Sequence, residues 1–336
     1  MTDVTDDANP PDIFHTENDE EYQRLLKEEM DYWNERDETL LSCTPEEAHQ
    51  RYFNERLTGN PERDWFETIA DYGTFKRGCV LGAGAGIIEE HLLEHHPELT
   101  LVIYDIAGDA LERIRTRLDA NFPGRTETRQ EDMNFLTLPE EAFDLVLSDS
   151  CIHHVLNLEH LAFQANRTLT ADGYFFLRDY VGESYFQFSP AKKQLFETFV
   201  RATSLEEPTF NWPDRENWID SPFEAVRSGE TLGVFRRYLS EEQVRTSHAF
   251  ATLLFGARVG RAPGSRALRD RVRRRVRRLF APLFAPILSW LAGERIARQA
   301  TAAQELLLLL DGILSDSKDF PGGAFAVYRK RPISAG

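Results

Sequence analysis

The feature that most constrains this chain is a segment of alternating glycines at residues 82–86 (GAGAG). The segment follows directly on a short apolar run, 79–81, and precedes a helical pattern that continues to His95. Glycines allow a tight turn in which the backbone approaches a ligand with no Cβ in the way. The exposed N–H groups at the start of the helix favour a carboxylate or a phosphate. The segment therefore predicts a strand–turn–helix unit with a ligand site at the turn.

Short apolar runs alternate with helical patterns through the middle of the chain. Five of these runs predict strands, at 79–81, 99–104, 127–130, 143–148 and 174–178. Helical patterns separate them, as at 109–120 and 158–169. Strands that alternate with crossover helices form a parallel sheet with helices on both faces. Two later apolar runs, Ala249–Phe255 and Ala324–Tyr328, predict a final antiparallel pair, which completes a seven-stranded, Rossmann-like α/β sheet.

Changes in composition divide the rest of the chain around this core. Residues 1–15 are acidic and contain prolines, which predicts a disordered tail with no signal peptide. Residues 16–75 predict lid helices at 16–41, at 45–56 and from Glu62, with Thr16 as the N-cap of the first. The core spans 76–182, a helical insertion spans 183–246, and the C-terminal strands and helix span 247–331. The many aromatic residues of the insertion either line an apolar pocket or form the core of a small helical cap.

The residues at the strand ends narrow the identity of the ligand. Ile87 stands where a dinucleotide-binding turn has its third glycine, which favours S-adenosylmethionine over NAD. Asp105, followed by Ile106, ends the second strand, where a carboxylate can accept hydrogen bonds from two ribose hydroxyls. After the third strand, Asp132 can accept a hydrogen bond from the adenine amino group and Met133 can pack on the ring. With the glycine turn and the end of the fourth strand, the predicted cofactor site comprises Gly82, Ala83, Gly84, Gly86, Asp105, Ile106, Asp132, Met133 and Asp149.

Residues 78–182 resemble the core of the class I S-adenosylmethionine-dependent methyltransferases. The stretches 143–161 (FDLVLSDSCIHHVLNLEHL) and 169–173 (LTADG) resemble the fourth- and fifth-strand motifs of the branch that acts on small molecules. Three outer segments look like parts of bacterial methyltransferases that modify sugars, lipids or secondary metabolites: 52–56, 179–182 and 224–228. The resemblance implies a methyltransferase that uses S-adenosylmethionine.

The chain departs from this family at Val80. Two residues before the first glycine, the family usually has an acid that contacts the methionine amino group. Here, either a carbonyl near Gly82 and the region of Asp149 hold this ammonium, or the affinity for the cofactor is reduced.

Several side chains are candidates for the methyl transfer itself. The methyl group of a sulfonium is already activated, so the protein mainly orients the acceptor and excludes water. A hydroxyl acceptor also needs a base near neutral pH, and His153 or His154, after the fourth strand, suits that role. Since the two rings are not expected to point the same way, one of them is expected to be structural. Tyr180 and Glu183 are expected to face the same cleft.

Two further features bear on ligands of the site. Arg227 either binds an anionic acceptor or forms a salt bridge within the protein. No metal site is expected, since Cys43, Cys79 and Cys151 lack the spacing of zinc ligands.

The charge distribution bears on partners and location. A net charge of −17 argues against general nucleic-acid binding, and the sequence predicts a cytoplasmic protein. Residues 258–278 nevertheless hold ten arginines and one acid, and the apolar run 279–292 that follows is shorter than a membrane-spanning helix. The segment 258–292 fits a peripheral contact with an anionic inner-membrane surface, a basic helix paired with the protein's own acids, or, as a third alternative, RNA.

The sequence thus predicts methyl transfer to a small-molecule or lipid-linked acceptor, at oxygen rather than nitrogen. Two alternatives stay open. A cofactor-binding pseudoenzyme with a regulatory role is favoured by Val80. An RNA methyltransferase is favoured only by the arginine cluster, and the chain lacks the Asn-Pro-Pro-Tyr type of signature after the fourth strand.

Overall fold

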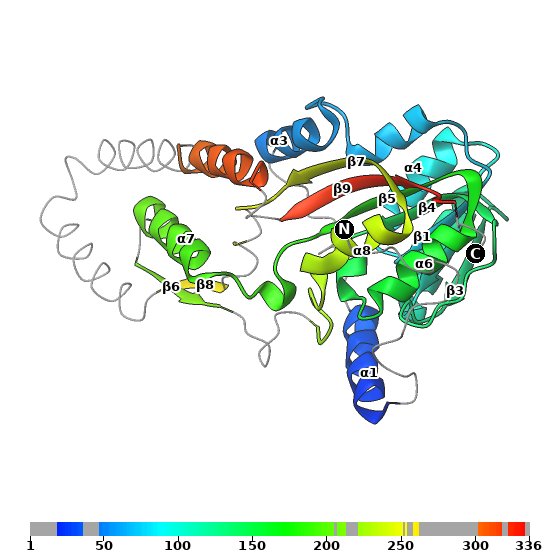
Figure 1. The fold of residues 1–336 in the computed structure, drawn as a ribbon, viewed down its shortest axis with the longest axis horizontal. Coiled ribbons are helices and arrows are strands. Elements are labelled where there is room, and N and C mark those ends of the chain that lie inside the picture. Colours follow the sequence, from blue (N-terminus) through cyan, green and yellow to red (C-terminus); the bar gives the residue numbers. More distant parts are fainter. Residues whose placement is uncertain are drawn as a thin grey trace, which may run out of the picture.

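The fold is built on a seven-stranded sheet with the strand order β3-β2-β1-β4-β5-β9-β7 (Figure 1). The structure, a computed structural model, describes residues 19–35, 47–204, 207–212, 221–250, 253, 258–261, 302–317 and 322–332. The first five strands pair in parallel, whereas β9 pairs antiparallel with both β5 and β7. The strands of the sheet are β1 (Arg77–Leu81), β2 (Thr100–Asp105), β3 (Thr126–Gln130), β4 (Phe143–Asp149), β5 (Leu169–Tyr180), β7 (Ser240–Ser247) and β9 (Gly323–Arg329). The predicted Rossmann-like α/β fold is confirmed.

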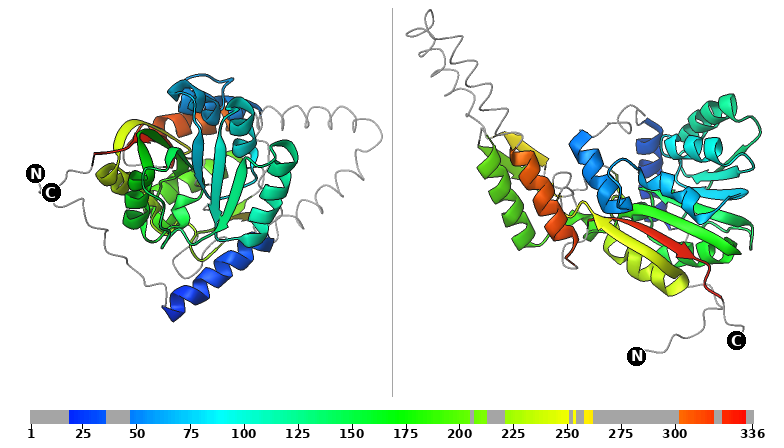
Figure 2. Two further views of the ribbon diagram at one scale, coloured as in Figure 1. Left: turned by 90° about the vertical axis from the view of Figure 1, so that its right-hand side faces the viewer. Right: turned by 90° about the horizontal axis from the view of Figure 1, so that it is seen from above.

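Helices cover both faces of the sheet, as Figure 2 shows, because its strands bury side chains on both sides. Cys79 and Leu81 of β1 belong to the core under α6 and α8, whereas Val80 between them belongs to the core under α4 and α5. The covering helices are α4 (Ile87–His95), α5 (Gly108–Asn121), α6 (Leu158–Thr168) and α8 (Thr231–Tyr238). This two-sided burial explains why the central strands are nearly continuous apolar runs.

Helices lie in each of the three predicted N-terminal segments, although the first begins four residues later than predicted and its predicted end lies outside the described residues. They are α1 (Glu20–Glu35), α3 (Glu47–Thr58) and the 3-10 helix η1 (Trp65–Tyr72). The predicted cap Thr16 lies outside the described residues, and the carboxylate of Asp19 accepts hydrogen bonds from the N–H groups of Glu21 and Tyr22. The first helix therefore starts at an acidic cap a few residues later than predicted.

One predicted strand is wrong. The seventh strand is β7, at Ser240–Ser247 and thus almost wholly inside the predicted insertion, whereas Ala249 and Phe250 of the predicted run Ala249–Phe255 form a turn. The side chain of Phe250 is buried in the core of the insertion. The run Ala249–Phe255 is apolar because part of it is buried outside the sheet. The edge strand β7 is polar, so the sequence pattern did not indicate a strand there.

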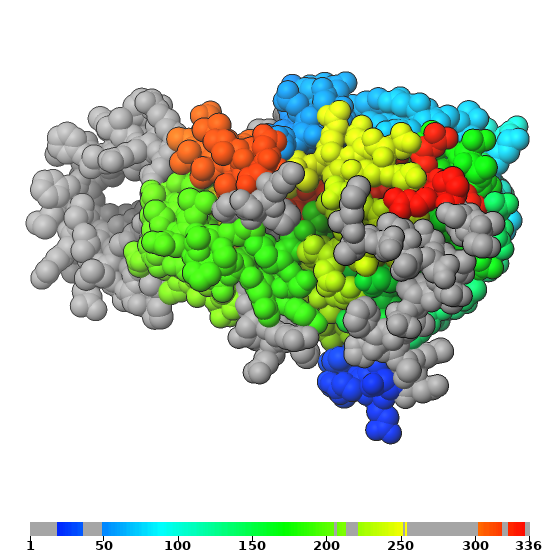
Figure 3. Space-filling model, viewed as in Figure 1, coloured from blue at the N-terminus to red at the C-terminus, as the bar shows by residue number. Residues whose placement is uncertain are grey.

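The insertion folds into a lobe beside the sheet. In Figure 3, α7 (Pro190–Thr203) and the C-terminal helix at residues 302–315 lie together in this lobe. Phe196 and Leu307 share its apolar core, and β6 (Pro208–Asn211) pairs with β8 (Arg258–Arg261) in a small second sheet. Short 3-10 turns complete the described elements: η2 (Ile152–His154), η3 (Ser184–Phe186) and η4 (Ser228–Glu230). Most aromatics of the insertion thus form the core of a cap, one of the two alternatives that the sequence left open.

Two predictions fall largely outside the described residues, namely the tail at 1–15 and the segment 258–292, of which only β8 is described. Among the described residues, no helix combines the length and the apolar character needed to span a membrane.

Candidate active site

The glycine turn connects β1 to α4 at the carboxyl edge of the sheet. Gly82, Gly84 and Gly86 have φ angles of +95°, +46° and +74°, a region that disfavours other residues. A Cβ on Gly82 would lie 2.7 Å from the side chain of Cys151, so close packing also requires glycine there. A Cβ on Gly84 would meet no atom within 4 Å. The turn is therefore packed on one side and open on the other, as a ligand cradle must be.

Asp105 ties this turn to the end of β2. One carboxylate oxygen accepts a hydrogen bond from the N–H of Ala83 at 2.7 Å, and the other accepts one from the N–H of Ala107 at 2.7 Å. Burial raises the pKa of Asp105 above its ordinary value, although both N–H groups oppose the shift. Ile106 is half-buried beside it. Since each carboxylate oxygen has a second lone pair, Asp105 can still accept the ribose hydroxyls of a nucleoside.

The predicted adenine site lies under the N-terminal helix α1. The Tyr22 hydroxyl donates to one oxygen of Asp132, and the N–H of Asn134 donates to the other at 2.9 Å. Met133 is buried, with its sulfur 3.7 Å from the sulfur of Cys151. Asp132 is thus held by partners that the sequence did not suggest, and its contact with adenine stays a prediction.

His153 and His154 lie on η2, directly after β4. Nδ1 of His153 lies 2.5 Å from Oδ1 of Asp179, and Nδ1 of His154 lies 3.0 Å from Oε1 of Glu29. Their Nε2 atoms lie 3.5 Å and 3.7 Å from the two carboxylate oxygens of Glu224. The prediction that the two rings cannot point the same way is wrong, because the tight 3-10 turn brings both ring edges to one carboxylate.

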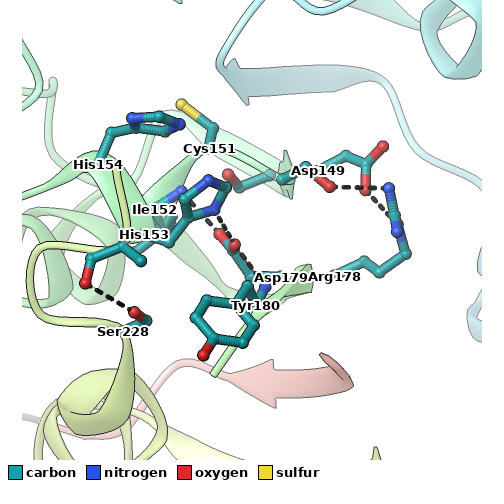
Figure 4. A network of polar contacts seen from close by, with 12 residues as sticks. Asp149, Cys151, Ile152, His153, His154, Arg178, Asp179, Tyr180 and Ser228 are labelled. Atoms are coloured by element: carbon teal, nitrogen blue, oxygen red, sulfur yellow. Dashed lines mark hydrogen bonds and ion pairs between the residues drawn. The ribbon is translucent and has the colours of Figure 1, made fainter. Parts of the chain in front are cut away.

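Asp179 fixes the orientation of His153, as Figure 4 shows. It is itself held by the N–H groups of Ile152 and Tyr180, each at 2.7 Å. Burial alone would lower the pKa of His153, but the Asp179 carboxylate, with the charges of Glu224 and Glu29, raises it to about 9. For Asp179, burial acts against the charged form, yet His153 holds its pKa below the ordinary value.

Helix α1 closes this part of the site. Glu29 is 1% exposed and accepts hydrogen bonds from the indole of Trp33 at 2.7 Å and from the N–H of Phe223 at 3.1 Å. Burial opposes its ionisation, but the ion pair with His154 and the hydrogen bond from Trp33 hold the pKa of Glu29 below its ordinary value. The Trp33 ring packs edge-on against His154 at 5.4 Å. Glu29, Asp179 and Glu224 were not predicted as site residues.

The other candidates have partners within the protein. The Tyr180 hydroxyl donates to the carbonyl of Glu183 at 3.1 Å, and burial, with the charge of Glu183, raises the pKa of Tyr180 well above its ordinary value. The Glu183 carboxylate pairs with Lys192. Asp149 at the end of β4 pairs with Arg178 (Figure 4). Tyr180 and Glu183 thus both have partners within the protein, and their proposed roles toward an acceptor stay predictions.

Arg227 is used as a structural brace. Its guanidinium lies 2.8 Å from a carboxylate oxygen of Glu159 and 2.7 Å from one of Glu230, and it donates to the carbonyl of Leu156 at 2.7 Å. Of the two alternatives from the sequence, the structure shows the salt bridge.

The same cluster has the composition of a cation site. One ligand atom each from His153, His154 and Glu224 lies within 4.8 Å of the others. Two imidazoles and a carboxylate could hold a divalent transition metal, so a test of the cluster has to separate proton transfer from metal binding.

Comparisons with known proteins find methyltransferases. Residues 80–177 match the family model described as "Methyltransferase domain". Solved structures with a similar fold include a phosphoethanolamine N-methyltransferase of Haemonchus contortus (15% identity, 90% of this chain and 60% of that chain, TM-score 0.46). They also include an S-adenosylmethionine-dependent methyltransferase of Mesorhizobium loti (18%, 79% and 96%, TM-score 0.42). A third is an O-methyltransferase from a polyketide synthase multienzyme of Brevibacillus brevis (12%, 85% and 72%, TM-score 0.42). The comparison with curated proteins gives no match.

The family match shows that residues 80–177 form a methyltransferase domain, and the seven-stranded sheet that carries the glycine turn and Asp105 has the Rossmann-like methyltransferase fold. Its cofactor is S-adenosylmethionine, for which the open side of the turn at Gly84 leaves room.

Proposed function

We propose that this methyltransferase transfers the methyl group to a hydroxyl of a small-molecule acceptor, with His153 as the general base. The observation that carries the proposal is the buried pair of His153 and Asp179 on the carboxyl side of β4 and β5. When bound, the cofactor supplies an activated methyl group. The protein orients the substrate hydroxyl and provides the base that takes its proton.

The hydrogen bond to Asp179 defines the state of the His153 ring. In the neutral imidazole, Nδ1–H donates to Asp179, so Nε2 has a free lone pair on the side of Glu224. That nitrogen can accept the proton of an acceptor hydroxyl, and Asp179 stabilises the imidazolium that results. Glu224 can accept a hydrogen bond from a second polar group of the acceptor. Asp179 is therefore a positioning residue, and His153 is the group that contacts the substrate.

The surroundings favour a small polar acceptor over RNA. Three carboxylates, those of Glu29, Asp179 and Glu224, face the two histidines, and such a site repels phosphodiesters. Helix α1 covers the site, with Tyr22 stacked on Phe223 at 5.7 Å. A covered site of this kind excludes water and suits a ligand that can be enclosed.

Incubation with tritium-labelled S-adenosylmethionine and a panel of sugar, phenol, carboxylate and amine acceptors tests the proposal. We expect label in an ether linkage, identified by mass spectrometry, and an unchanged rate with EDTA. Label found only on nitrogen would contradict the hydroxyl assignment. Loss of activity in EDTA, restored by a divalent metal, would replace the histidine base with a metal site.

The pH dependence of kcat/KM is a second prediction. Because the pKa of His153 is raised to about 9, the ring is protonated at neutral pH and the neutral base forms only as the pH rises. The rate should therefore increase up to about pH 9 and then level off. The stabilisation that goes with this shift is fully present below pH 6.5 and is lost as the pH approaches 9.

The variant Asp179→Asn should move the midpoint of this profile to lower pH, since it removes the charge that raises the pKa of His153. The measurement is kcat/KM between pH 6 and 10 under saturating cofactor, with thermal unfolding as the control for folding. A profile that has no inflection in the wild type, or that does not move in the variant, would rule out His153 as the base.

A further inference from the structure

The strand order indicates where the methionine end of the cofactor lies. Asp132 follows β3, Asp105 ends β2 and the glycine turn follows β1, so the predicted adenine, ribose and sulfonium positions run across the sheet in the order β3-β2-β1. The methionine end then lies over β1 and β4, at the start of α4 and beside Asp149. Its ammonium needs an anionic partner in this place, and Val80 of β1 is buried in the core with 2% exposure.

Glu89 supplies a carboxylate in this region. It is the third residue of α4, directly after the glycine turn, and is 5% exposed. Its neighbour Glu90 pairs with Arg117 and accepts a hydrogen bond from Asn121 at the protein surface. Within the part of the chain that the structure describes, Glu89 forms no ion pair. A buried carboxyl group with no cation beside it stays neutral until a ligand brings the positive charge, so Glu89 is a candidate partner for a cationic ligand.

The local charge balance supports a cationic ligand. Burial raises the pKa of Glu89 to about 8, and the negative charge of Asp149 adds to this shift. Asp149 is paired with Arg178 (Figure 4). The guanidinium of Arg178 also donates to the hydroxyl of Ser150 at 2.8 Å. Arg117 lowers the pKa of Glu89, but its effect is the smallest of those that act on this group. Glu89 is thus the carboxylate of this pair that lacks a cation of its own.

We propose that Glu89, with Asp149 beside it, binds the α-ammonium of the methionine moiety of S-adenosylmethionine and so takes the place of an acid at Val80. The methionine carboxylate can accept hydrogen bonds from N–H groups at the start of α4, a position that favours an anion, while Glu89 supplies the negative charge for the ammonium. Because Glu89 is largely protonated near neutral pH, binding of the ammonium ionises it and releases a proton.

Isothermal titration calorimetry with two ligands tests the proposal without turnover. S-adenosylhomocysteine carries the amino acid moiety, whereas 5′-methylthioadenosine has the nucleoside and lacks the ammonium. In Glu89→Gln we expect about 10- to 100-fold weaker binding of S-adenosylhomocysteine, the loss typical of a charge-assisted hydrogen bond, and unchanged binding of 5′-methylthioadenosine. The matched control Glu90→Gln, one residue along the same helix, should bind both ligands as the wild type does.

Equal losses for both ligands in Glu89→Gln, or no loss for either, would overturn the proposal. A second measurement on the wild type holds even if the variant does not fold. Titration of S-adenosylhomocysteine at pH 7 in two buffers of different ionisation enthalpy should show proton release, and titration of 5′-methylthioadenosine should show none. Absence of this difference would also overturn the proposal.

Discussion

Replacement of His153 by alanine is expected to lower kcat by about 10²- to 10⁴-fold, the usual contribution of a general base. Binding of S-adenosylhomocysteine should be preserved, because no atom of His153 contacts the glycine turn or Asp105 in the hydrogen-bond network of the described residues. The measurements are single-turnover methyl transfer and calorimetry on the same preparation. A loss of this size without a loss of affinity separates proton transfer from cofactor binding.

Two matched variants make the result specific. His95→Ala removes an exposed histidine of α4 and should leave kcat unchanged. His154→Ala should lower kcat less than His153→Ala, because Nδ1 of His154 faces Glu29 on the lid rather than Asp179 on the sheet. If His154→Ala lost turnover while His153→Ala lost only thermal stability, the roles of the two histidines would be reversed.

The core of the fold could be predicted because its strands are buried on both faces. Runs such as Cys79–Leu81 and Leu145–Leu147 are apolar throughout and can be recognised from the sequence without knowledge of the partner strands. The edge strand β7 (SEEQVRTS) is polar and half-exposed, so nothing in its composition distinguishes it from a loop. It belongs to the sheet because β9, far along the chain, provides its hydrogen bonds. A pairing of this kind is a tertiary effect that local patterns do not encode.

Site residues at the ends of the buried strands could be predicted from the sequence, whereas those that tertiary packing brings to the site could not. Asp105 follows from its place at a strand end, because the carboxyl ends of parallel strands converge on one edge. Glu29 does not, since it is one acid among many on an amphipathic helix, and only the docking of α1 brings it to His154. Asp179 and Glu224 lie in segments that resemble those of related methyltransferases, yet their contacts with the histidines depend on how β5 and the insertion pack.

Asparagine in place of Asp105 is expected to weaken the binding of S-adenosylhomocysteine by about 100-fold or more. The carboxylate accepts the N–H of Ala83 with one oxygen and that of Ala107 with the other, so an amide must point its NH₂ group at one of these donors. A hydrogen bond to a charged group contributes about 1.5–3 kcal/mol, and the variant also leaves a buried N–H without an acceptor. The single substitution would therefore remove both the predicted acceptor of the ribose hydroxyls and the carboxylate that holds the glycine turn at Ala83.

Calorimetry with S-adenosylhomocysteine and with 5′-methylthioadenosine distinguishes this effect from that of Glu89, because Asp105→Asn should weaken both ligands alike. Asp109→Asn, which changes an exposed acid in the first turn of α5, is the matched control and should bind both normally. Wild-type affinity in Asp105→Asn would show that the ribose does not lie at the end of β2. The whole path of the cofactor across the sheet, and with it the position assigned to its ammonium beside Glu89, would then have to be abandoned.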